Sequence, residues 1–99
     1  MSYQVVFTSK AECDLNCIEE YLSQFYPSTA RNFFDKAKKS ITLLEDMPYM
    51  YPEYEEDSYF RKMSVDDYLF CYHVDEESKR IIFHRIFHMK RDISNQILS

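Results

Sequence analysis

The 99-residue sequence contains no glycine and no tryptophan, and its three cysteines are an odd number. Three cysteines do not form the paired, spaced set of a disulfide framework, so we expect reduced thiols that pack as small apolar side chains. No run approaches the roughly 20 apolar residues that a membrane helix requires. Residues 1–24 also lack the charged start and apolar centre of a signal peptide. These absences predict a soluble, cytoplasmic protein with no membrane partner.

Basic residues are also too few for one class of protein. The formal net charge is −5 at pH 7, whereas a generic nucleic-acid-coating protein usually carries an excess of base. The charges are unevenly distributed: residues 1–60 hold 11 acidic and 5 basic side chains, and residues 61–99 hold 6 acidic and 7 basic ones. Attraction to a polyanion is therefore expected only locally, in the second half of the chain.

Apolar and aromatic residues, in contrast, are abundant. Hydrophobic residues make up 45% of the chain and aromatic residues 17%, which is enough for a compact core without disulfides or a structural metal. The length is close to the common size of one domain. We therefore expect a single domain over residues 1–99.

The first half of the chain predicts a strand followed by two helices. Residues 3–8, YQVVFT, alternate in the manner of a strand. Ser9 and Glu12 have the spacing of a capping box, which predicts that a helix begins at Ser9. Apolar residues then recur every three or four positions until residues 26–28 interrupt the helix, and a second helix of the same kind ends at Pro48. The short connection predicts an antiparallel helical hairpin.

The second half predicts a meander. Residues 48–58 have the composition of a loop, and three strand-like runs follow it, at residues 59–64, 68–74 and 80–88. Because the chain lacks glycine, neither link between these runs is of the Asn-Gly type, and we expect slightly longer loops. Residues 90–98 have the pattern of a short terminal helix.

The predicted order is therefore β-α-α-β-β-β, an α+β fold. The N-terminal helical hairpin is expected to pack on one face of a small, mostly antiparallel, four-stranded sheet. The other face of the sheet is expected to remain partly bare, and we expect the functional residues to lie there.

Several stretches carry an ordered set of patterns. They are YQVVFT, the Ala-x-x-Asp-Leu-x-x-Ile of SKAECDLNCIEEYL, the apolar spacing of PSTARNFFDKAKKSITLL, and the long C-terminal stretch with Arg-x-x-x-Val-x-x-Tyr-x-x-x-Tyr-x-Val and a closing His-x-x-Arg-Asp. In this order, over residues 3–93, they resemble the RelE/ParE toxins of type II toxin–antitoxin modules, also called plasmid stabilization system proteins. The resemblance implies a growth-arresting toxin that a cognate antitoxin wraps, and no cofactor.

Two mechanisms follow from this resemblance. ParE-like members poison DNA gyrase without known hydrolytic chemistry, and RelE-like members cleave mRNA inside the ribosome. RelE-like enzymes are strongly basic and carry a tyrosine in the C-terminal segment, whereas this chain is acidic and has no tyrosine after Tyr72. Together with the closing HMKRD, this favours the ParE-like branch and inhibition of DNA gyrase. The alternatives are a ribosome-dependent mRNA endoribonuclease, or an inactive, decayed toxin.

The candidate target-binding residues concentrate near the end of the last predicted strand. A cluster of cations there suits a phosphate backbone or an acidic partner surface. If the chain is a nuclease, a histidine can act as base or acid and arginines can clamp the phosphate; Arg61, Arg85, His88 and Arg91 would fill these roles. The full set of target-binding candidates is Arg61, Arg85, His88, Lys90, Arg91 and Asp92.

Four of these candidates also have a structural interpretation. For Arg85 the favoured interpretation is an ion pair to an acid on the neighbouring strand, with the head of the side chain remaining in water. Arg61 can pair with one of the aspartates at 66–67. Asp92 can cap the terminal turn and pair with Arg91.

The histidine spacing does not predict a metal site. His84 and His88 are four residues apart, which on a strand separates them by about 13 Å. Adding His73 and the cysteines gives no recognised metal-binding pattern. We therefore predict no bound metal.

Three aromatic residues share one face of the middle strand of the meander: Tyr68, Phe70 and Tyr72. We expect them to be core residues in contact with the helical hairpin. Alternatively, they form an aromatic wall that lines the antitoxin groove.

Overall fold

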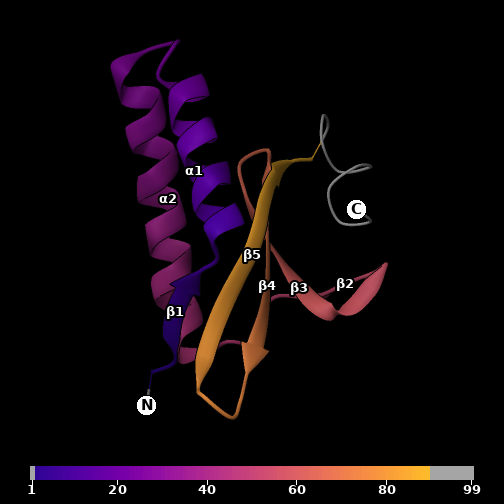
Figure 1. Ribbon diagram of the computed structural model, residues 1–99. Coiled ribbons are helices and arrows are strands. Elements are labelled where there is room, and N and C mark those ends of the chain that lie inside the picture. Colours follow the sequence, from indigo (N-terminus) through magenta and orange to yellow (C-terminus); the bar gives the residue numbers. More distant parts are fainter. Residues whose placement is uncertain (1, 90–99) are drawn as a thin grey trace.

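The computed structural model describes residues 2–89, so the terminal helix expected over residues 90–98 lies outside the described part. Two helices lie side by side along one side of the sheet (Figure 1), which confirms the α+β class and the helical hairpin. The elements are β1 (Gln4–Phe7), α1 (Ser9–Leu22), α2 (Pro27–Asp46), β2 (Glu53–Tyr54), β3 (Asp57–Val65), β4 (Tyr68–Asp75) and β5 (Arg80–His88). No helix among the described residues is long and apolar enough to cross a membrane.

Over residues 2–89 the sheet has five strands in the order β1-β5-β4-β3-β2, not the four that the sequence predicts. The fifth strand is β2, two residues within the stretch that the sequence analysis assigns to a loop. A strand of two residues is too short to leave an alternating pattern. Only β1 and β5 pair in parallel, whereas the other three pairings are antiparallel. The sheet is therefore mixed.

The first helix begins with a cap one residue earlier than predicted. Thr8 is extended, with φ −68° and ψ 165°, and its hydroxyl oxygen accepts a hydrogen bond from the backbone N–H of Ala11 at 3.2 Å. Ser9 is therefore the first helical residue and not the cap, and the predicted capping box is wrong. The same Thr8 hydroxyl donates to the carbonyl of His84 at 3.0 Å. This bond connects the start of α1 to β5.

The two links in the meander differ in length. Val65 pairs directly with Tyr68, so only two residues join β3 to β4, and the longer loop expected there is wrong. Asp66 has φ 54°, a left-handed conformation that aspartate tolerates better than most residues. The β4–β5 link is the longer one that the sequence predicts, with residues 76–79 between the paired Asp75 and Arg80.

The main core lies between the helical hairpin and the sheet. Phe70 and Tyr72 are completely buried and Tyr68 is 5% exposed, which confirms that they are core residues. The Tyr72 hydroxyl donates to the carbonyl of Pro48 at 3.0 Å, so this buried polar group has a partner. The helices contribute Ala11, Ile18, Phe33, Ala37 and Leu44 to this core.

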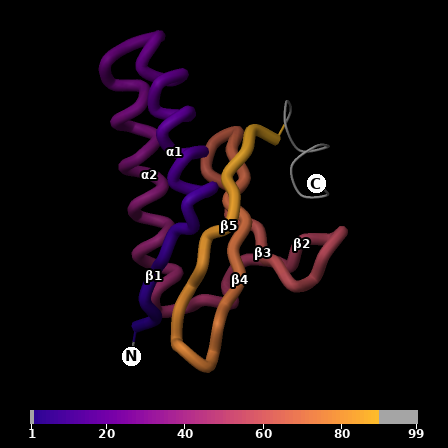
Figure 2. Tube along the Cα trace, in the orientation of Figure 1, coloured from indigo at the N-terminus to yellow at the C-terminus, as the bar shows by residue number. Residues whose placement is uncertain are grey.

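The face of the sheet away from the helices is only partly bare. Alternation along β4 places Leu69 and Cys71 on this face, where they form a second buried cluster with Tyr54 and Phe87. The hairpin of β2 and β3 projects away from the helices (Figure 2) and brings Tyr54 to this cluster. Burial raises the pKa of the Cys71 thiol to about 12.

The other two cysteines differ from the sequence-based expectation. Cys13 and Cys17 are exposed on α1, so the prediction that all three thiols pack as apolar side chains holds only for Cys71. All three are free thiols.

Candidate functional site

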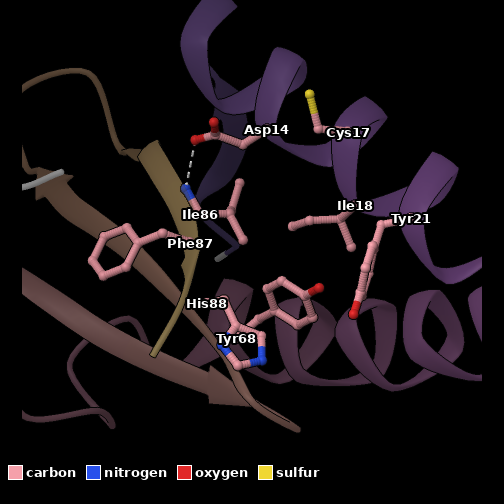
Figure 3. Close-up of a pocket in the computed structure, with 8 residues that line it drawn as sticks. All are labelled: Asp14, Cys17, Ile18, Tyr21, Tyr68, Ile86, Phe87 and His88. Atoms are coloured by element: carbon pink, nitrogen blue, oxygen red, sulfur yellow. Dashed lines mark hydrogen bonds between the residues drawn. The ribbon is translucent and has the colours of Figure 1, made fainter. Parts of the chain in front are cut away.

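A groove lies between α1 and the second half of β5 (Figure 3). One cavity of about 210 Å³ is lined by Asp14, Cys17, Ile18, Tyr21, Tyr68, Ile86, Phe87 and His88. A second cavity, of about 560 Å³, shares three of these residues and adds Leu22, Thr29, Phe33, Asp66 and Asp67. We call the two together the α1–β5 groove. Its lining combines apolar and aromatic side chains with three aspartates, at positions 14, 66 and 67.

Within residues 2–89, no strand lies beside the edge of β5 that borders this groove. β1 pairs with β5 only as far as Phe83, and the backbone groups beyond that point need other partners. Asp14 on α1 supplies one: its carboxylate accepts a hydrogen bond from the backbone N–H of Ile86 at 2.9 Å (Figure 3). Helix α1 therefore takes the place of a strand along this edge.

The same carboxylate binds Arg85. The guanidinium donates from Nε to one Asp14 oxygen at 2.8 Å and from Nη2 to the other at 3.3 Å. The side chains of Arg85 and Asp14 are 25% and 18% exposed, so the pair is partly withdrawn from water. The structural interpretation of Arg85 predicts an acid on the neighbouring strand. This is wrong, because Asp14 belongs to helix α1. Arg85 therefore ties β5 to α1.

Arg61 lies elsewhere on the sheet. Its guanidinium donates to the carbonyl of Tyr51 at 2.7 Å, lies 3.7 Å from the Glu53 carboxylate and stands over the Tyr49 ring at 4.9 Å. The expected pairing with residues 66–67 is wrong. Asp66 pairs instead with Lys36 of α2, at 2.9 Å. The contacts of Arg61 hold the segment that precedes β2.

His88 lies at the end of β5 and lines the α1–β5 groove. Its ring and the Tyr68 ring are in edge-to-face contact, with 5.1 Å between their centroids. In the sheet register His88 pairs with Tyr68, whereas Arg61 pairs with Tyr72. These positions are four residues apart along β4, or about 13 Å. The structure thus brings Arg85 and His88 to one edge and leaves Arg61 apart. Lys90, Arg91 and Asp92 lie outside the described residues.

A further cluster, absent from the predicted site, lies on the face of the sheet away from the helices. His73 Nδ1 and His84 Nε2 are 2.8 Å apart, and His73 Nε2 is 3.0 Å from the Tyr59 hydroxyl. The Tyr59 ring stacks on the His73 ring with 4.5 Å between centroids. Burial lowers the pKa of both imidazoles, which favours their neutral forms. We call these three residues the Tyr59–His73–His84 cluster.

The spacing of His73, His84 and His88 along the sequence does not predict that His73 and His84 are neighbours. The relevant neighbour is on the adjacent strand: Ile82 pairs with His73, and His84 is the next residue on that face. A register shift between Cys71 and Tyr72 leaves His84 as the extra residue of a bulge. The sequence signal that could have predicted the contact between His73 and His84 is the β4–β5 hairpin. A hairpin places residues that are equally distant from its turn opposite each other.

Most of the chain, residues 5–93, matches the family model of the ParE toxin of type II toxin–antitoxin systems, parDE. No curated protein matches the chain. Three similar solved structures are a chromosomal ParDE system from P. aeruginosa (TM-score 0.72, 18% identity, 88% of this chain and 96% of that one), the RelBE2 complex from Mycobacterium tuberculosis (0.62, 21%, 89% and 99%) and an archaeal RelE–RelB complex from Pyrococcus horikoshii OT3 (0.62, 17%, 92% and 99%). At these identities the similarity establishes the fold.

Proposed function

We propose, since this chain belongs to the ParE toxin family of type II toxin–antitoxin systems, that it arrests growth by binding and inhibiting DNA gyrase. The proposed contact residues are His88, Lys90 and Arg91, with Asp92 beside them. Lys90 and Arg91 follow β5 within three residues of His88 in the sequence. A binding inhibitor needs only that these cations reach an acidic surface or a phosphate backbone.

The observation that carries this proposal is the position of the two arginines that a nuclease would need. Stabilising a phosphorane requires cations that converge on one phosphate. Arg85 of β5 is engaged by Asp14, and Arg61 of β3 holds the segment before β2, with strand β4 between the two arginines. Their separation counts against the ribonuclease alternative and favours an inhibitor that acts by binding.

The purified chain is expected to inhibit supercoiling when it is incubated with gyrase, ATP and relaxed plasmid. A parallel reaction with translating ribosomes and a defined message is expected to leave the RNA intact. Unchanged supercoiling together with cleaved message would overturn the proposal in favour of the ribonuclease. Unchanged supercoiling, intact message and normal growth of cells that express the chain would identify an inactive toxin.

We further propose that the cognate antitoxin occupies the α1–β5 groove and the adjacent tip of the helical hairpin. Tyr21, which lines the groove, Phe25 and Tyr26 are 39%, 55% and 72% exposed. Three large exposed aromatic side chains this close together are typical of a surface that a partner covers. A disordered segment that folds into a partly helical form on binding can bury them. The similar solved structures are toxin–antitoxin complexes, which supports an antitoxin as the partner.

Phe25→Asp is expected to weaken antitoxin binding by tenfold or more, because it places a charge in the apolar contact. The binding partner in this test is the product of the adjacent reading frame. Calorimetry measures its affinity for the toxin, and co-expression of the two proteins measures how far it restores growth. Leu43→Asp is the matched control, since Leu43 is equally exposed, at 52%, and lies in the last turn of α2, well away from the hairpin tip in sequence. Equal weakening by both variants would contradict this docking site.

A further inference from the structure

The Tyr59–His73–His84 cluster joins the three central strands of the exposed sheet face. Tyr59 belongs to β3, His73 to β4 and His84 to β5. Phe60 adds a ring in edge contact with His84, at 5.2 Å between centroids. Neither the family membership nor the proposed gyrase contact uses these residues. Two imidazoles whose nitrogen atoms are adjacent can nevertheless share a hydrogen bond or bind a metal ion together.

The protons of the cluster can be assigned from its hydrogen bonds. If His73 donates its Nε2–H to the Tyr59 oxygen, its Nδ1 carries the lone pair and accepts the Nε2–H of His84. This arrangement satisfies both bonds with two neutral imidazoles. It is also the arrangement of many metal-binding histidines, in which one ring nitrogen binds the ion and the other donates a hydrogen bond that fixes the ring.

The spacing of the two nitrogen atoms suits a chelate. Metal–nitrogen bonds to histidine are about 2.0–2.1 Å long, so two nitrogens bound to one ion lie about 2.9 Å apart at a right angle and about 3.3 Å apart at the tetrahedral angle that zinc prefers. His73 Nδ1 and His84 Nε2 are already 2.8 Å apart. Binding requires His84 to move its proton from Nε2 to Nδ1, and both rings to tilt until their lone pairs point at the ion. The total number of protons on the two rings does not change.

We propose that His73 Nδ1 and His84 Nε2 chelate a divalent transition-metal ion of the Ni²⁺, Cu²⁺ or Zn²⁺ class on the exposed face of the sheet. Imidazole suits these ions and not Mg²⁺ or Ca²⁺, which prefer oxygen ligands. Tyr59 is a positioning residue: it holds His73 through Nε2 and is not itself a ligand. Because Tyr59 is 58% exposed, water can reach the ion and fill the remaining positions.

The site differs from a metal centre with three or four protein ligands. Among residues 2–89, no three or more His, Cys, Asp or Glu side chains are grouped so that they could hold a metal ion. A two-histidine chelate has fewer protein ligands than a structural zinc site. We therefore expect reversible binding, and a folded state that forms without the ion.

The test uses the full chain without an affinity tag, in a Cys13→Ser/Cys17→Ser background. Both thiols are exposed and would compete for the same ions. Titration with Ni²⁺ or Zn²⁺ alone is expected to show one saturable ion per chain by calorimetry and a rise in Tm, because the ion binds the folded state. Mg²⁺ at the same concentration is expected to change neither.

The chain has only three histidines, so a matched control is available. His73→Ala and His84→Ala are each expected to weaken binding by at least tenfold, whereas His88→Ala is expected to leave it unchanged. Tyr59→Phe keeps both ligands and is expected to weaken binding only a few-fold, with one ion still bound. Absence of saturable binding, or equal loss in the His88→Ala variant, would overturn the proposal.

A second measurement does not require the histidine variants to fold. In NMR spectra of the same Cys→Ser background, Zn²⁺ is expected to shift the ring resonances of His73 and His84 and to leave those of His88 in place. A shift confined to His88, or no shift in any imidazole, would also overturn the proposal.

Discussion

Asp14→Ala is expected to lower the free energy of unfolding by about 3 kcal/mol. The Asp14 carboxylate accepts hydrogen bonds from the Arg85 guanidinium and from the backbone N–H of Ile86. Without it, a partly buried cation and a backbone donor at the edge of β5 both lose the acceptor that this carboxylate supplies. Because Arg85 keeps 25% of its side-chain exposure, water offsets part of the loss, and the expected cost lies at the low end of that for a fully buried pair.

Urea denaturation measures this cost, and Asp35→Ala is the matched control. Asp35 is also an aspartate in the interior of a helix, but it is exposed on α2. Alanine favours helix slightly more than aspartate does at either position, so the control is expected to change stability by less than about 0.5 kcal/mol. A double-mutant cycle with Arg85→Ala then separates the ion pair from the bond to Ile86. Equal effects of Asp14→Ala and Asp35→Ala would contradict a role for Asp14 in joining α1 to β5.

The Asp14–Arg85 pair shows what the sequence could not reveal about this site. The alternating pattern of residues 80–88 predicts the strand correctly, and Arg85 interrupts its apolar face. That the partner is a helical residue 71 positions away follows from the length of β1, which stops pairing at Phe83 and leaves room for α1. Strand length is among the least predictable features of a sequence, because it depends on tertiary packing as well as on local pattern.

The elements with a strong periodic pattern were predictable, and those set by a single turn were not. Both helices and the three strands of the meander follow directly from apolar spacing. In contrast, β2 is too short to have a period, and the tight turn at Asp66 depends on one residue adopting a positive φ. The contact between His73 and His84 was missed for a related reason, since a bulge shifts the register between β4 and β5.

These differences also change which candidate residues remain available for a target. Arg61 and Arg85 hold a loop and a helix in place, so replacing either would change stability together with any effect on binding. Lys90 and Arg91 are the remaining lysine and arginine of the predicted target-binding set. The two C-terminal cations are therefore the most informative positions for testing gyrase inhibition.

The double variant Lys90→Glu/Arg91→Glu is expected to need about 30-fold more protein for half-inhibition of gyrase supercoiling, which corresponds to about 2 kcal/mol of binding free energy. Reversing two charges replaces attraction to an acidic or phosphate surface with repulsion. Because this attraction is electrostatic, inhibition by the wild-type chain is also expected to weaken when the salt concentration rises from 50 to 200 mM. Inhibition by the variant is expected to weaken less over the same range.

Lys38→Glu/Lys39→Glu makes the same change in net charge on α2, where both lysines are exposed. In either variant the formal charge falls from −5 to −9, since each reversal removes one positive charge and adds one negative charge. If only the C-terminal pair loses inhibition, the contact is local to the end of β5, since long-range repulsion would act on both variants. Equal loss in the two variants would instead attribute the effect to net charge, and unaltered inhibition by the C-terminal variant would exclude Lys90 and Arg91 from the gyrase contact.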